Sequence, residues 1–216
     1  PVGIRSIGIA GASTNLQAGY FGAQIDPLVL AKILEGIAPI SLTWPAAGQF
    51  WAIFEEEAFV LTMNGGTKDW SWSRYVFPDA ITDATILGDD LYLRAGNLVW
   101  RMDSEALEDD MVEGEGVPFE GYIAWPYLDF GLLGIDKMLE GFDIVADGTF
   151  RVSIGYNQRD FSLATPDYAL DGDTLPGSMV PMPLTAPSFQ FRLTFDANQA
   201  WEWYASNIYR NDQGTG

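Results

Sequence analysis

The fold of this chain is decided by the stretch FWAIFEEEAFVLTM, residues 50–63. Aromatic, aliphatic and β-branched residues fill positions 50–54 and 58–63, and the acidic triplet Glu55-Glu56-Glu57 separates the two runs. Short apolar runs on either side of a polar turn are typical of a β-hairpin. The stretch therefore predicts two antiparallel strands joined by an acidic turn.

A second stretch repeats this pattern and adds a strand to it. Residues 84–87 and 91–94 flank the turn Gly88-Asp89-Asp90, and a further turn at residues 95–97 leads to residues 98–102. Three short antiparallel strands in succession are typical of a propeller blade or of a β-meander. Two units are too few for a propeller of about four to eight blades, so if they are blades, others lie outside this sequence. The residues that we expect in the core are Trp51, Phe54, Phe59, Leu61, Leu91, Leu93 and Trp100.

Composition divides the chain into four segments, and the fold class that they predict is mainly β. They are a Gly-rich N-terminal segment with one short helix (1–39), propeller-like antiparallel hairpins (40–103), an acidic linker (104–116) and a β-sandwich-like domain (117–216). The helix is expected to have Asp26 as its N-cap, Pro27 at its first position and Gly36 as its end.

The N-terminal glycines allow two interpretations. Residues 8–13 carry small residues and glycines, as a phosphate-binding loop does, but they do not complete the dinucleotide-binding motif. The acidic residue that this motif needs about 20 positions later, at the end of a second strand, is also missing. The residues favour an extended, tightly packed segment.

Residues 103–116 carry seven acidic residues and no Lys or Arg. Such a block repels itself and stays solvated, which favours a linker. Calcium binding is the alternative, but the block lacks the alternating ligands, the central Gly and the closing Glu of a dedicated calcium loop.

The C-terminal segment is predicted to contain strands with one buried and one exposed face. Residues 149–154 and 189–195 alternate apolar with polar side chains, which is the pattern of a half-buried strand. Five prolines between residues 165 and 187 predict an extended loop that stays out of any central strand. The aromatic run at residues 201–209 predicts a last strand and, with the others, a β-sandwich or a strongly curved sheet.

Charge and composition exclude several function classes. The 30 acidic residues outnumber the 11 basic ones and give a net charge of −19, which opposes binding to the phosphates of nucleic acid. The chain has no cysteine and no histidine, which excludes disulfides, thiolate or imidazole metal ligands and the commonest general base. No apolar run approaches the ~20 residues of a membrane span, and no signal peptide is visible. Because the chain begins at Pro1, we expect a processed product or a part of a longer protein.

Any chemistry would have to rest on carboxylates, hydroxyls and aromatic rings. A glycosidase needs two acids in one cleft, and no diagnostic spacing marks such a pair here. A carbohydrate-binding or cell-surface-recognition β-domain, which uses exposed Trp with Asp or Asn, remains open as an alternative function. We therefore predict that the chain is not an enzyme and has no catalytic residue, no cofactor and no metal site.

One part of the sequence carries similarity beyond composition. It includes WSWSRYVFP (residues 70–78), GDDLYLRAGNLVWRMD (residues 88–103), YLDFG (residues 127–131) and KMLEGFD (residues 137–143). Together with residues 50–54 and 58–62, these stretches resemble the C-terminal half of the packaged-DNA stabilisation proteins of short-tailed, podovirus-like phages, also called the tail hub or nozzle. The resemblance covers about residues 40–216, and residues 4–37 match nothing in that family.

The resemblance implies a structural virion protein. Subunits of that family form a ring, sixfold by the resemblance, that extends the DNA channel below the portal and retains packaged DNA until ejection. The implied partners are further copies of the chain, portal or tail-adaptor proteins and the distal tail needle or tip. Double-stranded DNA would pass an acidic lumen without specific binding, which agrees with the net charge. The implied location is the virion tail, with the host cytoplasm during assembly.

The ring contacts are expected in the aromatic stretch at residues 70–77. Stable interfaces are rich in aromatic residues and Arg and poor in Lys and Glu, and this stretch contains no acidic residue. Packing in the core is the alternative for one face of the strand. The interface candidates are Trp70, Trp72, Arg74, Tyr75 and Phe77.

Overall fold

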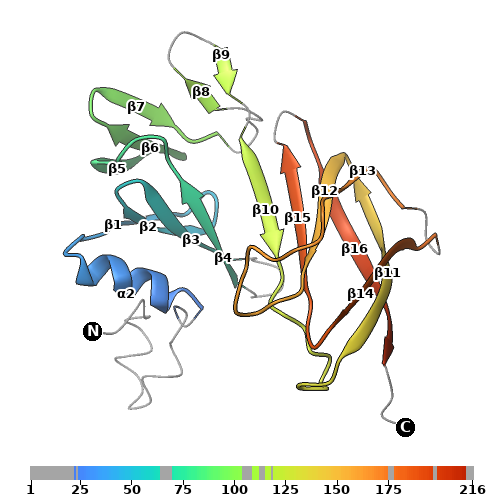
Figure 1. The fold of residues 1–216 in the computed structure, drawn as a ribbon. Helices are drawn as coiled ribbons and strands as arrows, with labels where there is room; N and C mark the ends of the chain where they lie inside the picture. Colours follow the sequence, from blue (N-terminus) through green and yellow to red (C-terminus); the bar gives the residue numbers. More distant parts are fainter. Residues whose placement is uncertain are drawn as a thin grey trace. The chain divides into compact units, whose positions relative to one another are not determined.

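The structure is a computed structural model with two compact units, residues 1–104 and 105–216 (Figure 1). It describes residue 22 and residues 24–63, 70–103, 109–111, 115–117, 119–174, 178–196 and 199–212. The described residues are mainly in strands and include one helix, so the predicted mainly β class is confirmed.

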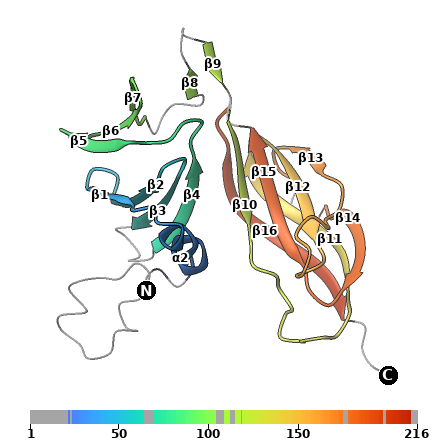
Figure 2. The ribbon, with the colours of Figure 1, turned by 60° about the vertical axis from the view of Figure 1, so that its left-hand side comes forward.

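The first unit has one helix and two antiparallel sheets in its described part. Figures 1 and 2 both place the larger sheet between the helix and the smaller sheet. The helix is α2 (Asp26–Leu34). The larger sheet has the order β1 (Ile40–Trp44), β2 (Gln49–Phe54), β3 (Glu57–Met63), β4 (Trp70–Val76). The smaller sheet has the order β5 (Asp83–Leu87), β6 (Asp90–Ala95), β7 (Leu98–Arg101).

The larger sheet of the first unit is buried on both faces at β2 and β3. Trp51 and Val60 pack with Leu91 and other residues of the smaller sheet. Phe54 and Phe59 point the other way and pack with Val29 of α2. Successive side chains of a strand point to opposite faces, so a strand covered on both sides needs a continuous apolar run rather than an alternating one. The runs at residues 50–54 and 58–60 meet this need.

Both predicted hairpins are confirmed, with small changes at their turns. Glu55 and Glu56 form the first turn, while Glu57 is already the first residue of β3. Of the predicted core residues, Leu61 and Trp100 are only half-buried, and the other five are at most 1% exposed. A stack of two open sheets does not establish a propeller, so the propeller-like arrangement stays a prediction.

The helix differs from its prediction at one residue. Asp26 is the first helical residue rather than the N-cap, because the N-cap position belongs to Ile25 and no side chain caps it. Pro27 lies in the first turn as predicted, where its missing N–H costs nothing. Gly36 follows the C-cap with a φ of +87°, a conformation that favours glycine. The predictions for residues 8–13 lie outside the described residues.

In its described part, the second unit has two antiparallel sheets that share one core, besides a short two-stranded sheet. Apolar side chains from both sheets form this core, among them Phe142, Ile144, Val152 and Phe191. One sheet has the order β10 (Glu120–Ala124), β15 (Gln190–Asp196), β12 (Thr149–Gly155), β13 (Tyr168–Asp171). The other has the order β14 (Val180–Ala186), β11 (Lys137–Asp147), β16 (Glu202–Asp212).

Two segments predicted to be irregular contain strands. The acidic segment 104–116 includes β8 (Asp109–Met111), which pairs with β9 (Glu115–Val117), because backbone pairing does not require apolar side chains. The proline-rich segment forms β13 and β14, with Pro181 and Pro183 inside β14. Both strands lie at sheet edges, where a missing N–H is tolerated. The prediction of a loop was therefore wrong, but the prediction that this proline-rich segment stays out of the central strands is confirmed.

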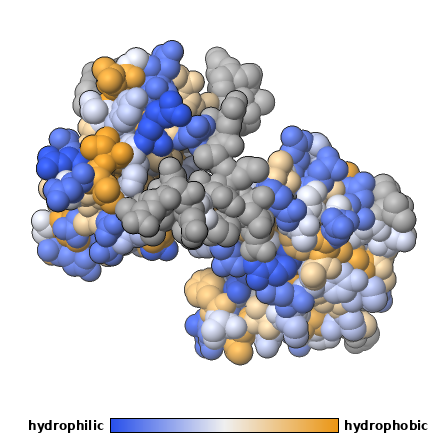
Figure 3. Space-filling view, turned by 90° about the horizontal axis from the view of Figure 1, so that it is seen from above, coloured by the Kyte–Doolittle hydropathy of each residue, from blue (hydrophilic) through white to orange (hydrophobic). Residues whose placement is uncertain are grey.

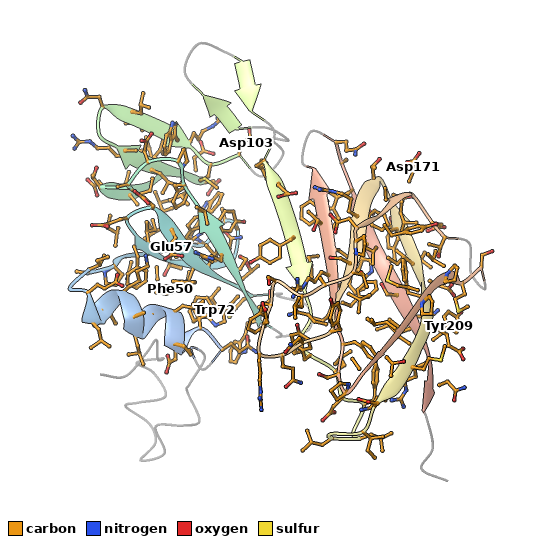
Figure 4. The ribbon with its side chains drawn as sticks, viewed as in Figure 1. Phe50, Glu57, Trp72, Asp103, Asp171 and Tyr209 are labelled. Atoms are coloured by element: carbon orange, nitrogen blue, oxygen red, sulfur yellow. The ribbon has the colours of Figure 1, made fainter. Side chains whose placement is uncertain are left out.

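Polar side chains join the strands of the second unit at two buried points. Tyr209 of β16, labelled in Figure 4, donates a hydrogen bond to Asp143 of β11, a carboxylate that is 2% exposed. Lys137, at the start of β11, is fully buried. Its Nζ donates to the backbone oxygens of Leu132, Ile135 and Pro187 at 2.6, 2.7 and 2.8 Å. These three bonds use all the donors of the ammonium group and tie two loops together.

Replacing Lys137 by Met is expected to lower the free energy of unfolding by about 2–4 kcal/mol, because three backbone carbonyl oxygens lose their buried donor while the side-chain volume is nearly kept. Urea denaturation of the two proteins measures the difference. Arg159→Met serves as the control, since Arg159 is exposed and its loss is expected to change stability by less than about 0.5 kcal/mol. Equal effects of the two substitutions would contradict a structural role of Lys137.

Candidate functional site

The five interface candidates lie on or next to β4, an outer strand of the larger sheet. Trp70, Trp72, Arg74 and Tyr75 belong to β4, and Phe77 follows it. The pairing of β4 with β3 sets Trp72 opposite Leu61 and Arg74 opposite Phe59. Because facing residues share a side of the sheet, Trp72 and Arg74 lie on the side covered by α2.

On the α2 side, two of the candidates are used within the subunit. Trp72 is half-buried against the apolar cluster that includes Phe54 and Phe59. Arg74 Nε donates to Glu57 Oε2 at 2.7 Å, and Lys32 Nζ of α2 donates to Glu57 Oε1 at 2.6 Å. Figure 4 shows Glu57 and Trp72 on this side of the sheet, near the helix. Glu57 thus binds a helix and a neighbouring strand at once.

The carboxylate of Glu57 is stabilised in its charged form. Burial opposes ionisation, but the hydrogen bonds from Lys32 and Arg74 outweigh this effect and hold the pKa of Glu57 below its ordinary value of 4.5. The hydrogen bond between Lys32 and Glu57 also raises the pKa of Lys32. Sequence reasoning missed Glu57, since it was assigned to a turn. Its place two residues before Phe59 would have put it on the same face as that core residue.

On the other side of the sheet, two further candidates also contact the subunit's own core. The ring of Tyr75 lies 5.1 Å from the ring of Trp51, and burial raises the pKa of its hydroxyl. Phe77 is half-buried against the cluster between the two sheets. The aromatic stretch is therefore explained partly by internal packing, as the alternative interpretation allowed.

Large apolar side chains nevertheless remain exposed along β4. Trp70 is 48% exposed, Val76 69% and Tyr75 37%. Figure 3, a view from above, shows hydrophobic residues exposed between hydrophilic ones elsewhere on the surface as well. An edge strand with apolar side chains on its surface is a ready contact for another chain. The structure thus leaves Trp70, Tyr75 and Val76 as the interface candidates that reach the surface.

Acidic residues are unevenly distributed over the chain. The first unit has 11 acidic and 6 basic residues, a net charge of −5, whereas the second has 19 acidic and 5 basic residues, a net charge of −14. Within the first unit, residues 36–54 carry no charged side chain, and β4 carries only Arg74. The two outer strands of the larger sheet, β1 and β4, are therefore free of acidic residues.

The first unit also has a shallow hollow of about 390 Å³. Asp89, Asp90, Arg101 and Asp103 are among its lining residues, and Trp44 donates its indole N–H to the backbone oxygen of Asp89 at 2.6 Å. The described residues contain no group of three or more acidic residues placed to hold a metal ion. Within the same ranges, none of the helical structure has the length and apolarity needed to cross a bilayer.

Comparisons with known proteins add no family assignment. The scan against protein-family models found no match, and the search of curated proteins found none either.

Replacing Glu57 by Gln is expected to lower the free energy of unfolding by about 1–2 kcal/mol at neutral pH, because the hydrogen bonds from Lys32 and Arg74 lose their charged acceptor. The loss stays this small because solvent partly screens both cations. The pKa of Glu57 is lowered on folding, so the wild type loses this stabilisation as the pH falls below 4.5. The difference between the two proteins should therefore shrink in acid, which urea denaturation over a pH series measures. Glu56→Gln, an exposed neighbour, is the matched control. A difference that stays constant as the pH falls would contradict the assigned ion pairs.

Proposed function

We propose that this chain is a structural subunit of a ring in the tail hub or nozzle of a short-tailed phage, where it prolongs the DNA channel and helps to retain packaged DNA. The proposal rests on the sequence resemblance and on one structural observation. That observation is the exposed, acid-free strand β4, with Val76 69% and Trp70 48% exposed in a chain of net charge −19.

The location of the acid-free strand explains why it supports assembly. Copies of a strongly acidic protein repel one another, and the repulsion is smallest where the approaching surfaces lack carboxylates. Apolar side chains in such a place gain from being buried by a neighbour, at roughly 25 cal/mol per Å² of apolar surface. An assembly contact at β4 thus combines low repulsion with a gain from the burial of apolar side chains.

The distribution of charge supports a channel function for the second unit. Its net charge is −14, and most of the acidic residues whose burial is described are exposed, among them Asp147, Asp171 and Glu202. A ring multiplies this charge around its axis, and DNA phosphates are repelled by it. A lumen that repels DNA lets the genome pass without binding it.

Carbohydrate recognition, the alternative function, receives no support from the hollow of the first unit. A sugar ring packs on the open face of an aromatic side chain, and Trp44 in the hollow is only 9% exposed. The ring proposal is therefore the one that we retain.

Replacing Val76 by Asp is expected to weaken self-association, because it places a carboxylate in the acid-free strand. Leu87→Asp is the control, since Leu87 is 70% exposed on β5 and the substitution changes the net charge equally. Mass photometry and sedimentation velocity should show ring-sized oligomers for the wild type and for Leu87→Asp, and smaller species for Val76→Asp. A wild type that stays monomeric at high concentration and low salt would falsify the proposal.

A further inference from the structure

The larger sheet of the first unit ends in two strands that each have one bonded neighbour. β1 pairs only with β2 and β4 only with β3 in the described part of the chain. The outer edge of such a strand presents backbone N–H and C=O groups that another strand can bind. The sheet therefore has two edges at which it can be extended.

The two edges carry few of the features that usually block such pairing. Proteins protect exposed edges with Lys, Pro, inward-pointing charges or bulges. β1 reads Ile40-Ser41-Leu42-Thr43-Trp44 and has no charged residue, while the single cation of β4, Arg74, is bonded to Glu57. Both strands pair with their neighbours without a register shift. The edges are thus regular and free of acid.

The number of strands sets how two such sheets can join. The order β1-β2-β3-β4 with antiparallel neighbours makes β1 and β4 run in opposite directions. If the same sheet of another copy is added in the same orientation, β4 therefore meets β1 in an antiparallel pair, which forms the more stable ladder. The first residues of β1 then lie beside the last residues of β4.

We propose that β4 of one copy pairs with β1 of the next copy, so that the larger sheets of neighbouring subunits become continuous. This inference rests on the proposed ring function and specifies the strands through which neighbouring subunits of the ring would bind each other. The occupant is a second copy because both edges lack acidic residues in a chain with 30 of them, so these are surfaces on which two such chains approach with least repulsion. The contact is head-to-tail, the kind that forms a ring where the rotation between successive copies closes, whereas pairing of β4 with β4 would end at a dimer.

Disulfide trapping tests the pair directly, because the native chain has no cysteine. Ser41 of β1 and Val76 of β4 are both exposed, and their strand partners Ala52 and Glu57 place them on the α2 side of the sheet. Facing residues of paired strands lie about 4.5–5.5 Å apart, within disulfide range. The double variant Ser41→Cys with Val76→Cys is therefore the main probe. Thr43→Cys with Val76→Cys covers a register shifted by two residues, which keeps the same face.

Mild oxidation of one of the double variants should give a ladder of disulfide-linked multimers. Each single variant should give none, and a mixture of Val76→Cys with the matching β1 single variant should stop at linked dimers, because each molecule then offers one reactive edge. Ser41→Cys with Leu87→Cys controls for random collision, since Leu87 is equally exposed on another strand.

The outcomes separate this inference from the function on which it rests. A ladder with either β1 partner supports the edge pairing. Ring-sized oligomers in mass photometry without a ladder overturn the pairing and leave the ring function standing. Linked dimers from Ser73→Cys alone would show pairing of β4 with β4 and overturn the head-to-tail contact. A chain that forms neither oligomers nor cross-links overturns both proposals.

Discussion

The first unit depends on the burial of both faces of β2 and β3. Trp51 and Ile53 point to the smaller sheet, and Phe54 and Phe59 point to α2. All four are at most 1% exposed. Each such side chain contributes about 1.5–3 kcal/mol when it is removed from water. The two central strands hold the helix and the smaller sheet in place, which leaves β1 and β4 as the outer strands.

The sequence was informative wherever a local pattern determines local structure. The hairpin at residues 50–63 and the three strands of the smaller sheet were predictable because apolar runs and acidic turns alternate along the chain. β14 was not predicted, because a proline inside a strand is compatible with an edge position, and only the finished sheet shows which strand is at the edge.

For the interface candidates, the sequence pattern could not separate core residues from surface residues. The aromatic stretch at residues 70–77 stands out by its composition, but its division between core and surface depends on pairing partners elsewhere in the chain. Arg74 was predicted to be an interface residue, and the structure places it on Glu57, 17 positions earlier. The alternation of a strand shows which residues share a face, and it does not show what covers that face.

Charge links the fold to the function that we propose. Association of a protein with 30 acidic residues is opposed least at surfaces without carboxylates, and both outer strands of the larger sheet in its first unit are free of acidic residues. The second unit carries the greater part of the negative charge on a sandwich with a core of its own. In the proposed function, contact and repulsion therefore belong to different units of one chain.

The burial of Lys137 gives the second unit a built-in chemical reporter. The chain has three lysines, and only Lys137 lies in the second unit. Since its ammonium group is enclosed by three carbonyl oxygens, an amine-reactive reagent can reach it only when the surrounding loops open. The rate of modification at this one nitrogen therefore reports how often these loops open, without any label being introduced.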